Sequence, residues 1–309
     1  MALYTIVIHG GAGVIPTLPG NQERLDRCHQ GLREALEAGF LVLKRGGSSL
    51  DAVTRAVALL EDNPLFNAGK GSVFNAEGHH EMDAAVMRGD TLDCGSVAGV
   101  SNIRNPILLA RAVMEQSGHV FLSGKGAEDF ARQIGLSREP DAYFFTQERW
   151  DQWQQSQKDF RDQGKLSGKF GTVGAVAIDQ QGNITSATST GGMTNKIPGR
   201  IGDSPVIGAG TYANNTTCGI SCSGHGEFFI RGVAAHDVSC LMQYAGLSLK
   251  EAMKLVVFEK IPGFGGSGGM IGVDGQGRGY IIFNTPGMYW GIQDSSGRGE
   301  TAIFPDPLI

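Results

Sequence analysis

The 309-residue sequence contains few cysteines, few charged residues and no long apolar run. Its five cysteines form no C-x-x-C pair, which argues against a disulfide framework and against a cysteine-rich zinc site. No stretch of about 18 apolar residues predicts a membrane span, and the first residues lack the regions of a signal peptide. The net charge of −5 includes no long basic run, so we expect no nucleic acid and no membrane as a partner. These absences favour a cytoplasmic enzyme, although they do not identify a substrate.

Metal-binding and phosphate-binding patterns are missing as well. The seven histidines include His79-His80 but no H-x-x-x-H or H-E-x-x-H pattern, so no catalytic metal is expected. The run Gly69-Lys70-Gly71-Ser72 lacks the G-x-x-x-x-G-K-[ST] spacing of a phosphate loop. We therefore expect no cofactor for catalysis.

Glycine, by contrast, is abundant: 47 of the 309 residues, about 15%, against an average of about 7%. Glycine adopts backbone angles that other residues avoid, and it lets the backbone approach a ligand closely. With 41% hydrophobic residues the chain can also form a sizeable core. We expect many tight turns and a site built largely from main-chain groups.

The hydrophobic pattern predicts sheets stacked between helix layers. Residues 3–9 form a short apolar strand that ends in a glycine turn at 10–13. Ser48 and Asp51 have the spacing of a capping box, and Asn105-Pro106 is typical of a helix start. Short turns pair the strands and the helices are grouped, which favours an α+β fold over a doubly wound parallel sheet. The expected helices are 22–45, 49–61, 105–116, 126–134, 227–245 and 248–260, and the further strands are 81–89, 93–101, 172–179, 184–190, 206–212, 217–223, 269–273 and 279–284.

The segment from about 138 to 171 interrupts this pattern. It is polar, charged and rich in glutamine, without a clean apolar stripe. Its start is compatible with a surface helix, and its end is typical of a flexible linker. Regular structure is expected again at Thr172, where the run TVGAVAID begins. The predicted linker therefore ends directly at the Gly171–Thr172 bond.

Thr172 becomes a candidate nucleophile if this bond is cut. A threonine hydroxyl is a weak nucleophile and needs a base. Cleavage would give Thr172 a free α-amine, which titrates at about pH 7.7–8.0 in model peptides and can take up the proton of the hydroxyl beside it. The alternative is that Thr172 is an ordinary β-branched strand residue. The local sequence alone favours that alternative.

Ordered motifs over nearly the whole chain add a second kind of information. GTVGAVAID at 171–179 and SATSTGGMTNKIPGRIGDSPVIGAGTYAN at 186–214 resemble the plant-type asparaginase/isoaspartyl peptidase family of N-terminal-nucleophile hydrolases. The runs HGGAG at 9–13, NPLFNAG at 63–69 and GHGE at 224–227 match the same family in the same order. The resemblance extends from residue 5 to about residue 290, and only the linker is uninformative.

The resemblance implies a four-layer αββα sandwich of the N-terminal-nucleophile type in a single domain, residues 1–309. It also implies that the Thr172 hydroxyl attacks the Gly171 carbonyl, so that the precursor cleaves itself into fragments 1–171 and 172–309. The mature enzyme would hydrolyse L-asparagine and β-aspartyl (isoaspartyl) dipeptides through a threonine acyl-enzyme and release L-aspartate. A heterotetramer, formed as a dimer of two α–β units, is the expected assembly.

The family pattern also implies a substrate clamp. Thr190 would hydrogen-bond Thr172 and tune it. Arg200 would hold the substrate α-carboxylate through two parallel bonds, while Asp203 and the Gly226 carbonyl would hold its α-ammonium. Without the resemblance, Arg200 and Asp203 would be interpreted as a surface ion pair, and Thr190 as an ordinary strand hydroxyl.

Three more residues would surround the reacting carbonyl. The Ser223 hydroxyl and the Gly224 N–H would form the oxyanion hole, with Gly224 also contacting the substrate, and the Asn67 amide would lie close by. Ser223 departs from the family, which usually has threonine there. A serine hydroxyl can still donate, but it lacks the methyl group that restricts the rotamer. The alternatives are turn-stabilising roles for Ser223 and Asn67.

The resemblance further implies a structural monovalent cation, commonly sodium, bound by backbone carbonyls next to Asn67. Backbone oxygens suit hard cations of this kind. The candidate carbonyls are those of Leu60, Glu61, Asn63, Phe66, Ala68 and Lys70.

Two other functions stay open on the sequence. One is the glycosylasparaginase branch, which often carries secretion features that this chain does not show. The other is a non-catalytic metabolite-binding protein on the same fold. The joint presence of Gly171-Thr172, Thr190, Arg200 and Asp203 weighs against a mere binding protein.

Overall fold

Two β-sheets form the centre of the structure, a computed structural model that describes residues 3–15, 22–163 and 171–304. The larger sheet has eight strands in the order β12-β11-β1-β5-β6-β2-β3-β4, and the smaller has four in the order β10-β9-β8-β7. Neighbouring strands are antiparallel except for the parallel pair β3–β4. The strands are β1 (Thr5–Gly13), β2 (Met82–Arg88), β3 (Cys94–Val100), β4 (Phe121–Ser123), β5 (Val173–Ile178), β6 (Ile184–Thr190), β7 (Thr211–Ala213), β8 (Cys218–Gly224), β9 (Gly268–Asp274), β10 (Gly279–Phe283), β11 (Gly287–Asp294) and β12 (Gly299–Ala302).

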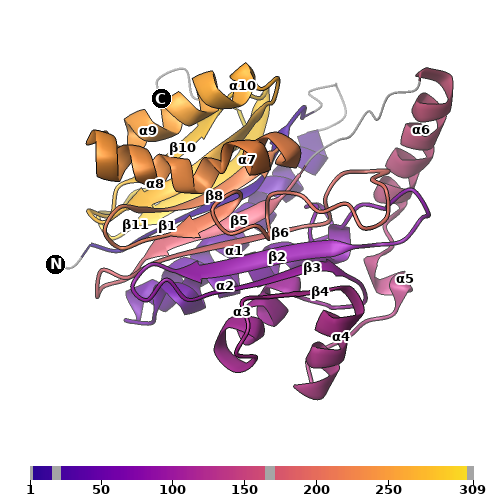
Figure 1. Ribbon diagram of the computed structural model, residues 1–309, viewed down its shortest axis with the longest axis horizontal. Coiled ribbons are helices and arrows are strands. Elements are labelled where there is room, and N and C mark those ends of the chain that lie inside the picture. Colours follow the sequence, from indigo (N-terminus) through magenta and orange to yellow (C-terminus); the bar gives the residue numbers. More distant parts are fainter. Residues whose placement is uncertain (1–2, 16–21, 164–170, 305–309) are drawn as a thin grey trace.

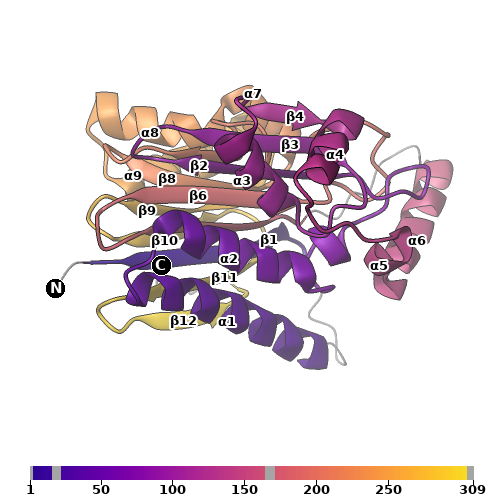
Figure 2. The ribbon, with the colours of Figure 1, turned by 90° about the horizontal axis from the view of Figure 1, so that it is seen from below.

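Helices cover the outer faces of the two sheets, which face each other (Figures 1 and 2). α1, α2 and α3 pack on the larger sheet and α8 and α9 on the smaller, while β1 and β5 contact both β8 and β9. The chain is therefore a mixed α+β protein with two packed sheets. None of the helices in the described ranges is long and apolar enough to cross a membrane. The helices are α1 (Gln22–Lys44), α2 (Ser49–Asp62), α3 (Pro106–Gln116), α4 (Gly124–Gln133), α5 (Asp141–Phe144), α6 (Gln147–Gln163), α7 (Gly226–Gly232), α8 (Ala234–Ala245), α9 (Leu249–Leu255) and α10 (Ile261–Gly263), with a 3-10 turn at Gly69–Gly71 and a π-helical turn at Val256–Lys260.

The central strand β1 is buried on both faces. Ile6 and Ile8 belong to the core under α1 and α2, whereas Val7 belongs to the core between the two sheets. Successive side chains of a strand point to opposite faces, so the unbroken apolar run of β1 serves two cores. In the same way, Val173 and Val176 of β5 divide between these two cores. β1 is consequently buried along nearly all of its length, and β5 along all of it.

Most of the expected elements are confirmed, and the exceptions have local causes. The first strand does not stop at residue 9: it continues through Gly13, with an irregular register between His9 and Gly11. The expected strand 206–212 is reduced to β7. The expected helix 227–245 is interrupted at Val233, which has a left-handed φ of 47°. β11 and β12 were not predicted, because glycine and charged residues interrupt their apolar pattern.

The segment predicted as a linker from about 138 is largely helical. It contains α5 and α6, and Phe144 and Ser156 are buried. Arg149 is buried too, since its guanidinium donates to the Gly71 and Leu65 carbonyls. The surface helix expected at the start of this segment is therefore confirmed and extends to Gln163, whereas the expectation that the linker begins near 138 is wrong. Residues 164–170 lie outside the described part of the chain.

Candidate active site

The Gly171–Thr172 bond lies at the start of β5, between β1 and β6 in the middle of the larger sheet. Thr172 is only 6% exposed. Gly11, with a φ of 112°, packs against this bond. A Cβ atom at position 11 would lie 2.8 Å from Gly171 Cα and 3.0 Å from Thr172 N. Only glycine combines this backbone angle with so close an approach, so part of the motif at 9–13 exists to accommodate the bond.

A second threonine lies directly beside Thr172. The Thr172 hydroxyl donates to Thr190 Oγ1 at 3.1 Å, and the Thr190 hydroxyl donates to the Gly171 carbonyl at 3.1 Å. The Gly192 N–H also donates to Thr190 Oγ1, at 2.9 Å. Thr190 therefore connects the hydroxyl of Thr172 to the carbonyl of the preceding residue, as a group that tunes Thr172 must.

Asn67 holds the same carbonyl from the other side. Its Nδ2 donates to the Gly171 carbonyl at 2.8 Å and to the Gly192 carbonyl at 2.7 Å. Its Oδ1 accepts from the Val73 N–H at 3.0 Å, which fixes the orientation of the amide. The Gly171 carbonyl thus accepts two hydrogen bonds, one from Asn67 and one from Thr190, as an oxyanion site requires.

His9 holds the backbone carbonyl of Thr172. Its Nδ1 lies 2.8 Å from the Thr172 carbonyl, and its Nε2 lies 2.8 Å from Ser221 Oγ. Because a carbonyl oxygen only accepts, Nδ1 carries the proton and Nε2 accepts from the Ser221 hydroxyl. Burial lowers the pKa of His9 to about 3, against the raising effect of the bond to Thr172. His9 is therefore neutral at neutral pH and positions Thr172 through its backbone.

Asp203 is a buried acid beside Gly226. It is 4% exposed, and its Oδ2 has no hydrogen-bond partner among the described residues. Burial raises the pKa of Asp203 to about 7. A Cβ atom at Gly226 would lie 2.8 Å from Asp203 Oδ1. The absence of a side chain at 226 therefore leaves room at the carboxylate, which can accept a bond from a cation.

Arg200 lies near this acid and is already paired. Its Nε and Nη2 donate to the two carboxylate oxygens of Glu227, at 2.8 and 2.9 Å. Its Nη1 is directed towards Gly192, where a Cβ atom would lie 3.4 Å from it. Arg200 also acts on Asp203 through its charge, which lowers the pKa of that acid against the larger effect of burial. The structure therefore brings Arg200, Asp203 and Gly226 together and pairs Arg200 with Glu227, while their role as a clamp stays a prediction.

Ser223 and Gly224 stand one step further from the bond. Ser223 Oγ is fully buried and accepts from the Ala12 N–H at 2.9 Å. In the described residues, no hydrogen bond joins Ser223 or Gly224 to Gly171 or Thr172. A Cβ atom at Gly224 would lie 2.6 Å from the Ser267 carbonyl, so this position requires glycine for packing. Their role as an oxyanion hole for substrate stays a prediction.

The loop proposed for a cation gathers neutral oxygens. Cβ atoms at Gly71 and Gly69 would lie 2.1 Å from the Phe66 carbonyl and 2.5 Å from the Glu61 carbonyl. No group of three or more acidic, histidine or cysteine side chains able to hold a metal occurs in the described ranges. Carbonyl oxygens carry two lone pairs, so they can accept an N–H and still bind a hard cation. Four of the six predicted carbonyls accept a backbone N–H: those of Leu60, Asn63, Phe66 and Ala68.

The sequence did not identify two residues of the site, His9 and Glu227. The motif at 9–13 contains His9 but does not indicate its role, because the contact of His9 with Ser221 depends on a fold that brings β1 and β8 together. Glu227 follows Gly226 in the same matched run, but its pairing with Arg200 bridges 27 positions. The signal available for both residues was their place inside the glycine-rich runs.

The fold and the site define a hydrolase, since a buried threonine hydroxyl lies next to a carbonyl held by two donors. The chain belongs to the asparaginase family, whose sequence profile matches residues 2–303. It is 51% identical over 300 residues to the isoaspartyl peptidase of Escherichia coli K12, covering 94% of each chain. It is 42% identical over 317 residues to the plant-type L-asparaginase of Thermococcus kodakarensis, covering 97% of this chain and 100% of that one. The isoaspartyl peptidase/L-asparaginase of Danio rerio is 43% identical over 289 residues, 93% of this chain and 91% of its own.

Proposed function

We propose that this protein is a self-processing amidohydrolase that cleaves L-asparagine and β-aspartyl dipeptides through a threonine acyl-enzyme. Its single domain would be the four-layer αββα sandwich of N-terminal-nucleophile hydrolases, maturing into chains 1–171 and 172–309. The observation that carries the proposal is the placement of the Gly171 carbonyl between Asn67 Nδ2 and the Thr190 hydroxyl, with the Thr172 hydroxyl on Thr190.

Self-cleavage would use this arrangement directly. The Thr172 oxygen attacks the Gly171 carbonyl carbon, and the oxyanion that forms is held by Asn67 and Thr190. The C–N bond breaks, the hydroxyl proton goes to the departing nitrogen, and an ester joins the two residues. Water hydrolyses this ester to a Gly171 carboxylate and a free Thr172 hydroxyl. Thr172 then carries an α-amine that is able to act as the base.

Hydrolysis of a substrate would repeat the same steps on an external amide. Arg200 would hold the α-carboxylate of the aspartyl group, and Asp203 with the Gly226 carbonyl its α-ammonium. The Thr172 oxygen attacks the side-chain carbonyl, the amine leaves with a proton, and an aspartyl ester remains on Thr172. Ser223, Gly224 and Asn67 would stabilise the oxyanion, and water releases L-aspartate and restores the hydroxyl.

The names of the relatives support both substrates, since they include isoaspartyl peptidases and L-asparaginases. The glycosylasparaginase reaction and a mere binding role have no such support. The carbonyls of Leu60, Glu61, Asn63, Phe66, Ala68 and Lys70 would hold a structural sodium ion that steadies the loop carrying Asn67. A dimer of α–β units would be the assembly.

The test is kinetic. Freshly purified protein is allowed to process, the two chains are confirmed on a denaturing gel, and L-asparagine and a β-aspartyl dipeptide are offered side by side. We expect L-aspartate from both substrates. Processed protein that releases L-aspartate from neither one contradicts the proposed function.

A further inference from the structure

A cavity of about 310 Å³ opens beside the Gly171–Thr172 bond. It is lined by Gly171 and Asn67 and by the glycine-rich end of β1. Arg24 of α1 and Glu148 and Arg149 of α6 also line it. This size is at the lower end of the range for small-molecule sites, about 300–1,000 Å³. The cavity therefore connects the reacting bond with a group of charges that the proposed mechanism does not use.

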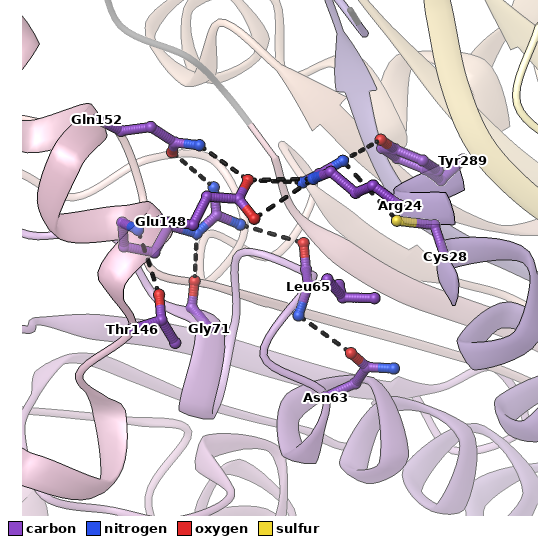
Figure 3. A network of polar contacts seen from close by, with 10 residues as sticks. Arg24, Cys28, Asn63, Leu65, Gly71, Thr146, Glu148, Gln152 and Tyr289 are labelled. Atoms are coloured by element: carbon purple, nitrogen blue, oxygen red, sulfur yellow. Dashed lines mark hydrogen bonds and ion pairs between the residues drawn. The ribbon is translucent and has the colours of Figure 1, made fainter. Parts of the chain in front are cut away.

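Two of these charges form a pair (Figure 3). Arg24 Nη2 donates to Glu148 Oε1 at 2.8 Å, and Arg24 Nε lies 3.2 and 3.3 Å from the two Glu148 oxygens. Arg24 Nη1 also donates to Tyr289 Oη at 3.1 Å. The side chains of Arg24 and Glu148 are 26% and 41% exposed, so the pair is open to solvent and to a ligand. An incoming carboxylate can therefore share or replace Glu148 at Arg24.

Arg149 adds a positive charge without a counterion of its own. It donates to the Gly71 carbonyl at 2.8 Å, to Gln152 Oε1 at 2.9 Å and to the Leu65 carbonyl at 3.3 Å. These bonds occupy three of the five N–H donors of a guanidinium. In the described residues no salt bridge joins it to an acid. Counting Arg24, Arg149 and Glu148, which are the charged residues of the lining, the cavity carries +2 − 1 = +1.

Asn67 connects the cavity to the predicted aspartyl clamp. The Asn67 Nδ2 group bridges two carbonyls, that of Gly192 and that of Gly171. Gly192 is the residue that Arg200 approaches, and Gly171 is a wall of the cavity. Neither Arg200 nor Asp203 lines the cavity. An amide whose aspartyl end lies at Arg200 therefore directs its amine end into the cavity.

We propose that this cavity is the subsite for the leaving amino acid of a β-aspartyl dipeptide, and that Arg24 and Arg149 bind the α-carboxylate of that residue. The inference rests on the proposed function and names the part of the substrate that it leaves open. Self-cleavage separates Gly171, which lines the cavity, from Thr172. L-Asparagine loses only ammonia and has no group that reaches Arg24. The cavity is thus a specificity element for dipeptides.

The experiment compares β-aspartyl-alanine with its C-terminal amide, which lacks the leaving-side carboxylate. For the processed wild type we expect kcat/KM to be about tenfold higher for the acid than for the amide, the effect of one charge-assisted hydrogen bond. Arg24→Gln removes one of the two cations and should lower this acid-to-amide ratio through KM, while Arg149 keeps part of it. Glu148→Gln removes the competing carboxylate and should raise the ratio.

Arg27→Gln is the matched control, because Arg27 is an exposed arginine of the same helix outside the cavity lining, and its ratio should equal that of the wild type. Equal kcat/KM for acid and amide in the wild type overturns the subsite. So does an Arg24→Gln variant whose ratio stays at the wild-type value, since Arg24 then reads no carboxylate. L-Asparagine is measured on every preparation: if processed protein hydrolyses L-asparagine but shows no acid-to-amide difference, only the subsite fails. If it hydrolyses neither L-asparagine nor dipeptide, the proposed function fails as well.

Discussion

Both ends of the site contain an arginine paired with a glutamate, and each end has one further charged residue beside that pair. At the aspartyl end Arg200 is paired with Glu227 through both carboxylate oxygens, and at the cavity end Arg24 is paired with Glu148 in a similar way. The aspartyl end adds a buried acid, Asp203, with an oxygen that no described residue contacts. The cavity end instead adds a buried cation, Arg149.

The charge of this third residue determines which charged groups of a substrate each end can bind. An Arg–Glu pair alone is close to neutral and, where exposed, contributes little. With Asp203 beside it, the aspartyl end can hold a carboxylate and an ammonium on one carbon. With Arg149 beside it, the cavity end holds a carboxylate only. The comparison teaches that the sign of one buried, incompletely paired group distinguishes the two ends.

The largest expected effects concern the carbonyl between the two ends. Asn67→Ala should slow self-cleavage by about 10²–10³, the usual cost of one oxyanion donor. Ser223→Ala should process normally, since no hydrogen bond of the described residues joins Ser223 to Gly171, but should lose turnover of substrate by a similar factor. Ser223→Thr should lose little. The measurements are the rate of appearance of the two chains on a gel and kcat on L-asparagine.

These variants separate cleavage from turnover. Near-normal turnover by Ser223→Ala removes Ser223 from the oxyanion hole. Processing of Asn67→Ala at the wild-type rate shows that the bond to the Gly171 carbonyl has no part in cleavage. Circular dichroism of each variant checks that the fold is retained.

The next effect concerns the acid that distinguishes the aspartyl end. Asp203→Ala should lower kcat/KM by at least about tenfold, because the substrate ammonium loses a charge-assisted bond. Arg200→Lys should not preserve carboxylate binding at this end, since an ammonium lacks the planar fork of a guanidinium. Acetylating the α-amine of a β-aspartyl substrate should lower kcat/KM of the wild type far more than kcat/KM of the Asp203→Ala variant. If acetylation costs the wild type nothing, Asp203 does not read the ammonium.

The pH dependence of kcat/KM sharpens the same point. Burial raises the pKa of Asp203 to about 7, and the acid must be ionised to hold an ammonium. The value of kcat/KM, which reports the free enzyme, should therefore fall as pH decreases through about 7. Bound substrate stabilises the ionised form, so the corresponding limb of kcat should lie at lower pH. Coincident limbs in kcat and kcat/KM argue against Asp203 as the titrating group.

A smaller effect concerns stability rather than activity. His9 is held neutral, with a pKa of about 3 against 6.5. The unfolded chain takes up this proton first as pH falls, so stability should decrease from about pH 6.5 towards pH 3, by roughly 1.4 kcal/mol per pH unit for one proton. His9→Gln should flatten this dependence in urea melts, whereas His119→Gln, at an exposed histidine, should keep it. An unchanged slope in His9→Gln excludes His9 as its source.

The family resemblance pointed to the residues of the aspartyl end, whereas nothing in the sequence pointed to the cavity end. Arg200, Asp203 and Gly226 lie inside runs that resemble the family, and α1 and α2 carry strong apolar periodicity. Arg149 lies in a helix without an apolar stripe, and hydrogen bonds to loop carbonyls rather than apolar contacts hold its guanidinium in place. Hydrophobic patterning does not detect such a residue. The sequence therefore indicated a surface helix at the start of this segment, but neither its length nor its buried residues.

The central claim is that Thr172 cuts the bond before it, and intact mass with N-terminal sequencing tests this most directly. The wild type should yield chains of 171 and 309 − 171 = 138 residues, the second beginning with Thr172. Thr172→Ala should remain a single 309-residue chain without hydrolase activity. Cleavage of the Thr172→Ala variant at the same bond would contradict the account, because another group would then supply the nucleophile.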